Sequence, residues 1–202
     1  MGRTFTESAR RRQIVEAAIE VIAETGYAKA SFARIAEQAG LSSTGMISYY
    51  FAGKDDLMRE VVTEVLRVSQ EYMLPRVTAA VGPRARLRVS IESNVELVSV
   101  YPKHLAALIA VLAGLGPLDQ SQVEFAAGQR AVLAAQEQAV REAQAAGEFG
   151  AFDPAVLVTA VRGAIDALVV RAVAEPGLNI AAAARELADL FDRATRPPTT
   201  RH

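Results

Sequence analysis

The sequence predicts an all-α protein of about nine helices, and three observations support this fold class. Apolar residues recur at three- and four-residue spacings along most of the chain. Alanine is abundant, tryptophan is absent, and aromatic residues make up only 6% of the 202 residues, a composition that favours helix over strand. No segment shows the alternation of a half-buried strand. Because 51% of the residues are hydrophobic, the chain can bury a core and is not a disordered protein.

Three short helices are expected in the first fifty residues. The first, residues 8–25, is amphipathic and ends at Gly26. Ser31 is a suitable N-cap for the second helix, which stops at the turn 39–42. The third covers residues 44–50. This arrangement of two short helices around a glycine-containing turn predicts a helix-turn-helix.

Longer helices are expected in the rest of the chain. Lys54 opens a helix whose acidic first turn suits the positive helix N-terminus, and this helix is expected to end at Pro75. Glycine and proline pairs and an Asp-Pro start signal then divide the remaining sequence. They predict five further helices at residues 83–101, 102–113, 119–146, 154–173 and 180–193. Residues 196–202 are expected to be a disordered tail.

The composition excludes several function classes. There is no Cys, and His104 and His202 are the only imidazoles, so a disulfide framework, a thiolate zinc site and a cysteine nucleophile are excluded. No phosphate-cradling glycine loop, His-Glu-x-x-His or Gly-x-Ser-x-Gly segment is present. We therefore expect neither an enzyme nor a bound metal or cofactor. The most apolar stretch, residues 105–115, is about half of the roughly 20 residues that cross a bilayer, which predicts a cytoplasmic protein without a membrane partner.

The charge balance depends on the segment. The whole chain has a formal net charge of −1, but residues 1–54 carry seven basic and five acidic side chains. Four arginines lie within residues 1–12, and we interpret this segment as a flexible basic arm that can reach DNA. The alternative is a solvated run of charge. Because the charge excess of residues 1–54 is small, we expect DNA affinity to depend on a few individual contacts rather than on a broad basic surface.

The third predicted helix has the features of a base-reading helix. A major groove admits one helix with small or hydrogen-bonding groups facing the bases and an apolar back that packs on the protein. Ile47 and Phe51 can form that back. The side facing DNA would consist of Ser43, Thr44, Gly45, Met46, Ser48 and Tyr49.

Four segments carry a resemblance to a known family: Ile14–Ala18, Glu24–Tyr27, Phe32–Ala36 and Tyr50–Leu57. Together they resemble the N-terminal domain of TetR-family transcriptional regulators. The span from Gly40 to Phe51 is one residue longer than is usual in that family, so the third helix is expected to start late or to follow a longer turn. The resemblance implies a DNA-binding domain at residues 1–54 and a ligand-binding and dimerisation domain at residues 55–195.

The resemblance also implies roles for individual residues. Tyr50 and Lys54 would bind phosphates, and Ser31 and Arg34 would lie on the helix that crosses the sugar-phosphate backbone. Each of these residues also has a structural alternative. Tyr50 would be a packed tyrosine, and Lys54 would be an exposed lysine at a helix end. Ser31 would be a simple helix cap, and Arg34 a solvated charge. An inducer cavity would include Asn94, Tyr101, His104 and Gln129, although His104 also fits a structural role. Dimerisation through the last two helices would use Leu157, Ala160, Ala164, Leu168, Leu187 and Phe191.

These inferences predict a ligand-responsive regulator. It would bind a palindromic operator in double-stranded DNA as a homodimer, act as a repressor, and leave the operator when a small-molecule inducer binds. The alternative is a helical interaction module without specific DNA binding. The sequence does not identify the inducer.

Overall fold

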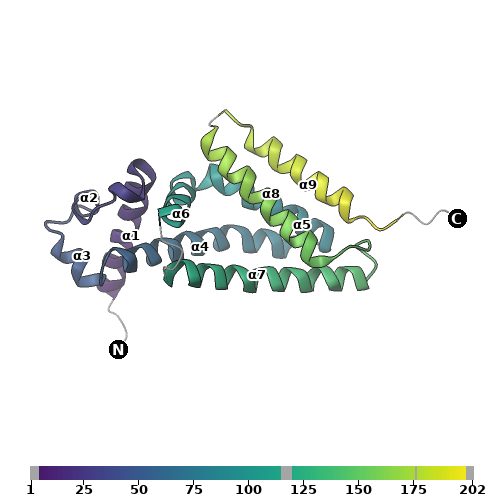
Figure 1. Cartoon of the computed structure of the whole chain (residues 1–202), viewed down its shortest axis with the longest axis horizontal. Helices are drawn as coiled ribbons and strands as arrows, with labels where there is room; N and C mark the ends of the chain where they lie inside the picture. The colour runs from purple at the N-terminus through teal and green to yellow at the C-terminus, as the bar shows by residue number, and fades with distance from the viewer. Residues whose placement is uncertain (1–4, 115–119, 176, 199–202) are drawn as a thin grey trace. The chain divides into compact units, whose positions relative to one another are not determined.

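The computed structural model describes residues 5–114, 120–175 and 177–198 and confirms the all-α class, with nine α-helices and one short 3-10 helix in these ranges (Figure 1). The chain divides into two compact units. Unit 1 comprises Met1–Val68 and Tyr101–Glu124, and unit 2 comprises Ser69–Val100 and Phe125–His202. Each unit is described by itself below.

Unit 1 is built on helix α1, Phe5–Thr25, which packs against α2 and α6. Ile14, Ala18 and Ile22 are at most 1% exposed, and their spacing of four residues places them on one face. Helix α1 also contacts η1. The other elements of unit 1 are η1 (Tyr27–Lys29), α2 (Phe32–Gln38), α3 (Gly45–Tyr50), the part of α4 (Lys54–Ala79) up to Val68, and α6 (Pro102–Gly114).

The turn between α2 and α3 has a defined geometry. Gly40 has a φ of +64°, a conformation that glycine adopts without strain. The N–H of Leu41 donates to the carbonyl of Ala36 at 2.8 Å, and the N–H of Gly40 donates to that of Glu37 at 3.0 Å, which is a Schellman ending. Helix α3 then begins at Gly45. The late start agrees with the longer span from Gly40 to Phe51.

Two sequence expectations about helix ends are wrong. Helix α1 begins at Phe5, so residues 5–12 are helical and not a flexible arm, while Arg3 lies outside the described residues. Helix α4 continues through Pro75 to Ala79. A proline removes one helical hydrogen bond and crowds one carbonyl, but it does not end a helix whose neighbouring turns are intact.

Unit 2 contains α5 (Pro83–Val100), α8 (Pro154–Ala174) and α9 (Ile180–Thr195), together with the parts of α4 and α7 (Gln120–Ala145) that follow Val68 and Glu124. Helix α5 packs against both α8 and α9 (Figure 1). The Asp153 carboxylate accepts hydrogen bonds from the N–H groups of Ala155 and Val156, which confirms the predicted N-cap of α8.

A small apolar core joins α7 to α8. It consists of Val140, Ala143, Phe149, Leu157 and Val158. Leu133, Phe152, Val161 and Phe191 pack at its edge, together with Leu87 of α5. The core thus links α7, α8 and the residues that connect them.

Ion pairs connect α5 and the residue after α9 to α9 itself. Arg84 and Arg88 of α5 pair with Asp192 and Asp189 of α9. Arg196, the first residue of the expected tail, also pairs with Asp192 at 2.8 Å. Residues 196–198 have no regular structure, and residues 199–202 lie outside the described part of the chain.

Within the described ranges, no single helix has the length and apolar character needed to cross a membrane. The bent pair formed by α5 and α6 would meet that requirement only together, by length and composition.

Candidate functional site

The surface of α3 and the turn before it is largely open to solvent. The side chain of Ile47 is 0% exposed and that of Phe51 is 2% exposed, so they attach α3 to unit 1 as predicted. Tyr49 is 74% exposed, and its ring meets that of Tyr50 edge to face at 5.0 Å. The predicted base-facing residues are all exposed: Ser43, Thr44, Gly45, Met46, Ser48 and Tyr49.

Arg11 of α1 anchors the end of α3. Its guanidinium donates a 2.6 Å hydrogen bond to the carbonyl of Tyr50 and lies 4.3 Å from the centre of the Phe51 ring. It also pairs with Glu60 of α4 at 2.9 Å. With only 12% of its side chain exposed, Arg11 connects three helices of unit 1 and is not available as a DNA contact.

Lys54 has partners within unit 1. Its ammonium donates to the carbonyl of Tyr27 at 2.9 Å and lies 4.2 Å from the centre of the Tyr27 ring. One N–H of the ammonium is therefore committed to the protein, while the side chain remains half-buried at the start of α4. Lys54 thus joins η1 to α4 at the edge of the helix-turn-helix.

The first turn of α4 is closed by Asp56. The backbone N–H of Ala52 donates to its carboxylate at 3.0 Å. This hydrogen bond, aided by one from Arg59, holds the pKa of the Asp56 carboxyl below its ordinary value. The contact fixes the short connection between α3 and α4.

The remaining predicted DNA contacts lie in the same unit. The Ser31 hydroxyl accepts a hydrogen bond from the N–H of Arg34 at 3.4 Å, so Ser31 caps α2. The Arg34 side chain is exposed, and Tyr50 is half-buried. Unit 1 thus contains all ten predicted contact residues. The sequence did not reveal the roles of Arg11 and Tyr27, because partners 39 and 27 residues distant leave no local pattern.

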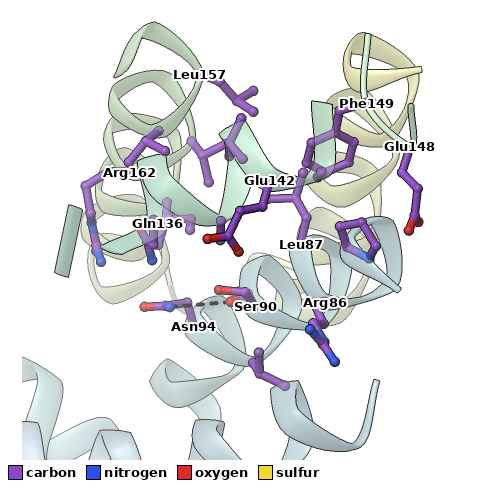
Figure 2. Close-up of a pocket in the computed structure, with 18 of the residues that line it drawn as sticks. Arg86, Leu87, Ser90, Asn94, Gln136, Glu142, Glu148, Phe149, Leu157 and Arg162 are labelled. Carbon is purple, nitrogen blue, oxygen red and sulfur yellow. Dashed lines mark hydrogen bonds between the residues drawn. The ribbon is translucent and has the colours of Figure 1, made fainter. Parts of the chain in front are cut away.

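Unit 2 contains a cavity of about 450 Å³ bounded by α5, α7 and α8. Its walls are mostly apolar and include Leu87, Val140, Phe149, Leu157 and Ile165. Polar groups enter it from two sides. Figure 2 shows Gln136 and Glu142 of α7 extending toward α5, where Ser90 and Asn94 lie, with the Asn94 amide donating to the Ser90 carbonyl at 3.4 Å. Arg86 and Arg162 also line it.

The predicted inducer contacts are divided between the units. Asn94 lines the cavity of unit 2. Tyr101 and His104 belong to unit 1, where their rings are 5.6 Å apart and the His104 Nε2 lies 3.9 Å from a carboxylate oxygen of Glu16. The side chain of Gln129 is outside the described residues. Sequence reasoning missed Arg86, Gln136, Glu142 and Phe149, because nothing local distinguishes a cavity-lining position from another helix surface.

The predicted dimerisation residues differ in exposure. Leu157 belongs to the core of unit 2, and Phe191 packs at its edge. Ala160 is exposed, and Ala164, Leu168 and Leu187 are half-buried. Several large apolar side chains of α8 and α9 are exposed, namely Val156, Val170, Val173 and Leu190. In the described part of the chain, no group of three or more His, Asp or Glu residues is arranged to hold a metal ion.

The all-helical fold and the exposed α3 define the class of helix-turn-helix DNA-binding proteins. Residues 14–61 match the model of the bacterial regulatory proteins of the tetR family. Through this segment the chain is similar to the TetR family, whose members are DNA-binding transcription regulators. The matched residues run from α1 into α4 and include the whole helix-turn-helix.

Similar proteins are found both by sequence and by structure. The HTH-type transcriptional regulator BetI 1 of Chromohalobacter salexigens is 38% identical over 95 residues, which are 46% of this chain and 46% of that protein. The chain is thus matched over about half the length of its curated relatives.

Two solved structures share the fold. FadR of Bacillus subtilis, in complex with stearoyl-CoA, has a TM-score of 0.75 at 22% identity over 89% of this chain and 96% of that one. AibR, in complex with isovaleryl coenzyme A and operator DNA, has a TM-score of 0.73 at 22% identity over 94% and 99%.

Proposed function

We propose that this chain is a ligand-responsive transcription regulator that reads operator DNA with unit 1 and binds its effector in unit 2. The observation that carries the proposal is the exposed α3, held by Ile47 and Phe51 within the segment that matches the TetR family. In this proposal α3 enters the major groove, and α2 crosses the backbone. Because its target is chromosomal DNA, we place its action in the cytoplasm.

Two kinds of contact are expected at the DNA. Arg34 is exposed on α2 and is suited to a phosphate. Lys54 gives one hydrogen bond to Tyr27 and has two further N–H groups that a phosphate could accept from. Thr44 and the neighbouring exposed residues of α3 face the base edges. Phosphate contacts give affinity and register, and base contacts give preference for a sequence.

A titration of labelled duplex DNA with the full chain tests this division. The duplexes are the DNA upstream of the protein's own coding region and a shuffled control, at two salt concentrations. Lys54→Ala should weaken binding to both duplexes and reduce the salt dependence by about one ion. Thr44→Ala should alter the preference between duplexes with an unchanged salt dependence. Equal binding of all duplexes, with no effect of either variant, would favour a helical interaction module.

The effector site is assigned to the cavity of unit 2. A volume of about 450 Å³ with apolar walls and a few polar groups is typical of a small-molecule site. FadR and AibR were solved with acyl-CoA molecules, so we take acyl-CoA thioesters as the first class to test. The acyl chain would lie against Leu87 and Phe149.

The effector proposal has a direct test. A bound acyl-CoA should raise the unfolding temperature and lower the affinity for the operator. Leu157→Arg, which places a charge in the apolar wall, should abolish both effects. Asn94 stays a proposed contact in this cavity, and Tyr101, His104 and Gln129 remain untested predictions.

We further propose a homodimer formed by α8 and α9. Their exposed apolar side chains include Val170 and Leu190, at 55% and 51% exposure. A dimer presents two copies of α3 to successive major grooves and therefore selects a palindromic operator. In sedimentation experiments Val170→Glu should give a monomer. Val81→Glu, at a valine that is 90% exposed outside α8 and α9, should leave the mass unchanged.

Repression follows from operator occupancy that excludes RNA polymerase. A reporter fused to the upstream DNA should be active without the protein, silent with it, and active again when the effector is added. Loss of reporter activity in the absence of the protein would instead indicate an activator.

A further inference from the structure

Residues 42–50, which form the turn before α3 and α3 itself, lack charged and amide side chains. Residues 42–50 include no Arg, Lys, Asn, Gln, Asp or Glu. The exposed side chains of this segment are those of Ser42, Ser43, Thr44, Met46, Ser48 and Tyr49. The segment therefore presents hydroxyl and apolar groups and no charge or amide.

This composition limits how the segment can distinguish base pairs. Bidentate contacts to guanine need Arg or Lys, those to adenine need Asn or Gln, and the amino group of cytosine is read by Asp or Glu. A hydroxyl group both donates and accepts, so it discriminates weakly between bases. Apolar contact with the 5-methyl group of thymine is the remaining specific signal in the major groove.

Met46 is the side chain best placed for such a contact. It is 36% exposed on the same short helix whose inner residue, Ile47, is fully buried. At the adjacent Gly45, an added Cβ would have only the Ser43 hydroxyl within 4 Å, at 3.5 Å. The backbone beside Met46 is therefore uncovered and can approach a duplex closely. Met46 is unbranched and adapts to the shape of a methyl-lined groove.

The cationic side chains of the helix-turn-helix lie outside residues 42–50. Arg34 is on α2. Lys54, at the start of α4, donates a hydrogen bond to the carbonyl of Tyr27. The guanidinium of Arg11 donates a hydrogen bond to the carbonyl of Tyr50 and forms an ion pair with Glu60. These positions suit phosphate contact or internal support, so they leave base discrimination to α3.

We propose that Met46, together with the methyl group of Thr44, reads thymine 5-methyl groups in the operator, and that α3 makes no bidentate contact to a base. This proposal rests on the proposed DNA-binding function. It predicts operators whose most selective positions are A·T pairs with thymine methyls facing α3.

The test begins with duplexes that the full chain selects from a random-sequence library. Each thymine of the selected duplex is then replaced by deoxyuridine, which removes only the methyl group. At one or more positions in each half-site, affinity should fall about fourfold, the factor for burying one carbon group of this size. Met46→Ala should bind the thymine and uracil duplexes equally at those positions, and Met46→Leu should retain the discrimination.

A matched control keeps the result interpretable. Met73→Ala removes a methionine side chain from α4, in unit 2, and should leave the ratio of thymine to uracil affinities as in the wild type. Circular dichroism would verify that each variant is folded. Equal affinity for the thymine and uracil duplexes in the wild type, or unchanged discrimination in Met46→Ala, would overturn the proposal but not DNA binding.

Two further outcomes are decisive. Replacement of guanine by 7-deazaguanine removes the N7 acceptor of a bidentate contact. If that replacement weakened binding more than any uracil replacement, thymine methyls would not be the main signal, and the proposal would be overturned. If the chain selected no sequence from the library, the proposed function would fail, and this inference with it.

Discussion

Replacing Arg11 with Met tests whether this buried guanidinium holds the end of α3. Arg11→Met removes a charge-assisted hydrogen bond of 2.6 Å to the carbonyl of Tyr50, which contributes about 1.5–3 kcal/mol. The stacking on Phe51 adds about 0.5–1 kcal/mol. The pair with Glu60, whose side chain is 38% exposed, adds at most about 1 kcal/mol.

The net loss is smaller than the sum of these contributions. The Nε of Arg11 is buried without a hydrogen-bond partner among the described residues, and methionine removes that unfavourable group. We therefore expect the free energy of unfolding to fall by about 3 kcal/mol, which lowers the unfolding temperature by roughly 6–12 °C in a chain of this size.

Urea unfolding followed by circular dichroism measures this loss, and hydrogen exchange of the α3 amides locates it. The matched control is Arg12→Met, because Arg12 is the neighbouring arginine of α1 and is exposed. Its cost should be within about 0.5 kcal/mol. Equal losses for the two variants would refute the assignment of Arg11 as an anchor.

Three further predictions concern packing and pH. Gly114→Ala should destabilise unit 1 and weaken DNA binding, because the new Cβ would lie 2.2 Å from a ring carbon of Tyr27; unchanged thermal unfolding and DNA titrations would contradict this. Gly150→Ala should cost about 1–3 kcal/mol in urea unfolding, since its Cβ meets a backbone carbonyl at 2.8 Å, whereas Gly128→Ala, in open space on a helix, should stabilise by up to about 1 kcal/mol. Asp56→Ala should cost about 1 kcal/mol near pH 7. Because the folded pKa of Asp56 lies below its ordinary value of 3.8, its contribution is complete above pH 3.8 and is lost as the pH falls through the folded pKa; a pH-independent difference between wild type and variant would contradict this.

Local patterns predicted much of the fold. The caps at Ser31 and Asp153 and the turn at Gly40 are encoded by adjacent residues, so the sequence predicted where α2 and α8 begin and where α2 ends. Pro75 misled the prediction because its effect depends on the turns around it, which continue α4 to Ala79.

The charged residues were harder to assign. Arg11 looked like part of a flexible arm because the sequence shows only neighbouring arginines, whereas the structure buries it between α1, α3 and α4. The sequence predicts Lys54 at the start of a helix, but its hydrogen bond to Tyr27 is visible only in the folded unit. Long-range partners decide such roles, and periodicity carries no information about them.

The residues that line the cavity were also difficult to predict from the sequence. Asn94 lines the cavity of unit 2, but Tyr101 and His104, close in sequence, belong to unit 1. The chain changes unit at Val100, between α5 and α6, and no composition shift marks that point. Polar residues on apolar helices therefore identified candidates without showing which of them share a site.

The proposed function requires unit 1 to distinguish DNA sequences through α3. The most direct measurement is the ratio of dissociation constants for a duplex selected by the full chain and for a shuffled duplex of equal composition, at one salt concentration. We expect at least about a thousandfold preference for the selected duplex, and a smaller preference after substitution in α3. A ratio near one, with the protein folded, would show that α3 does not read DNA sequence.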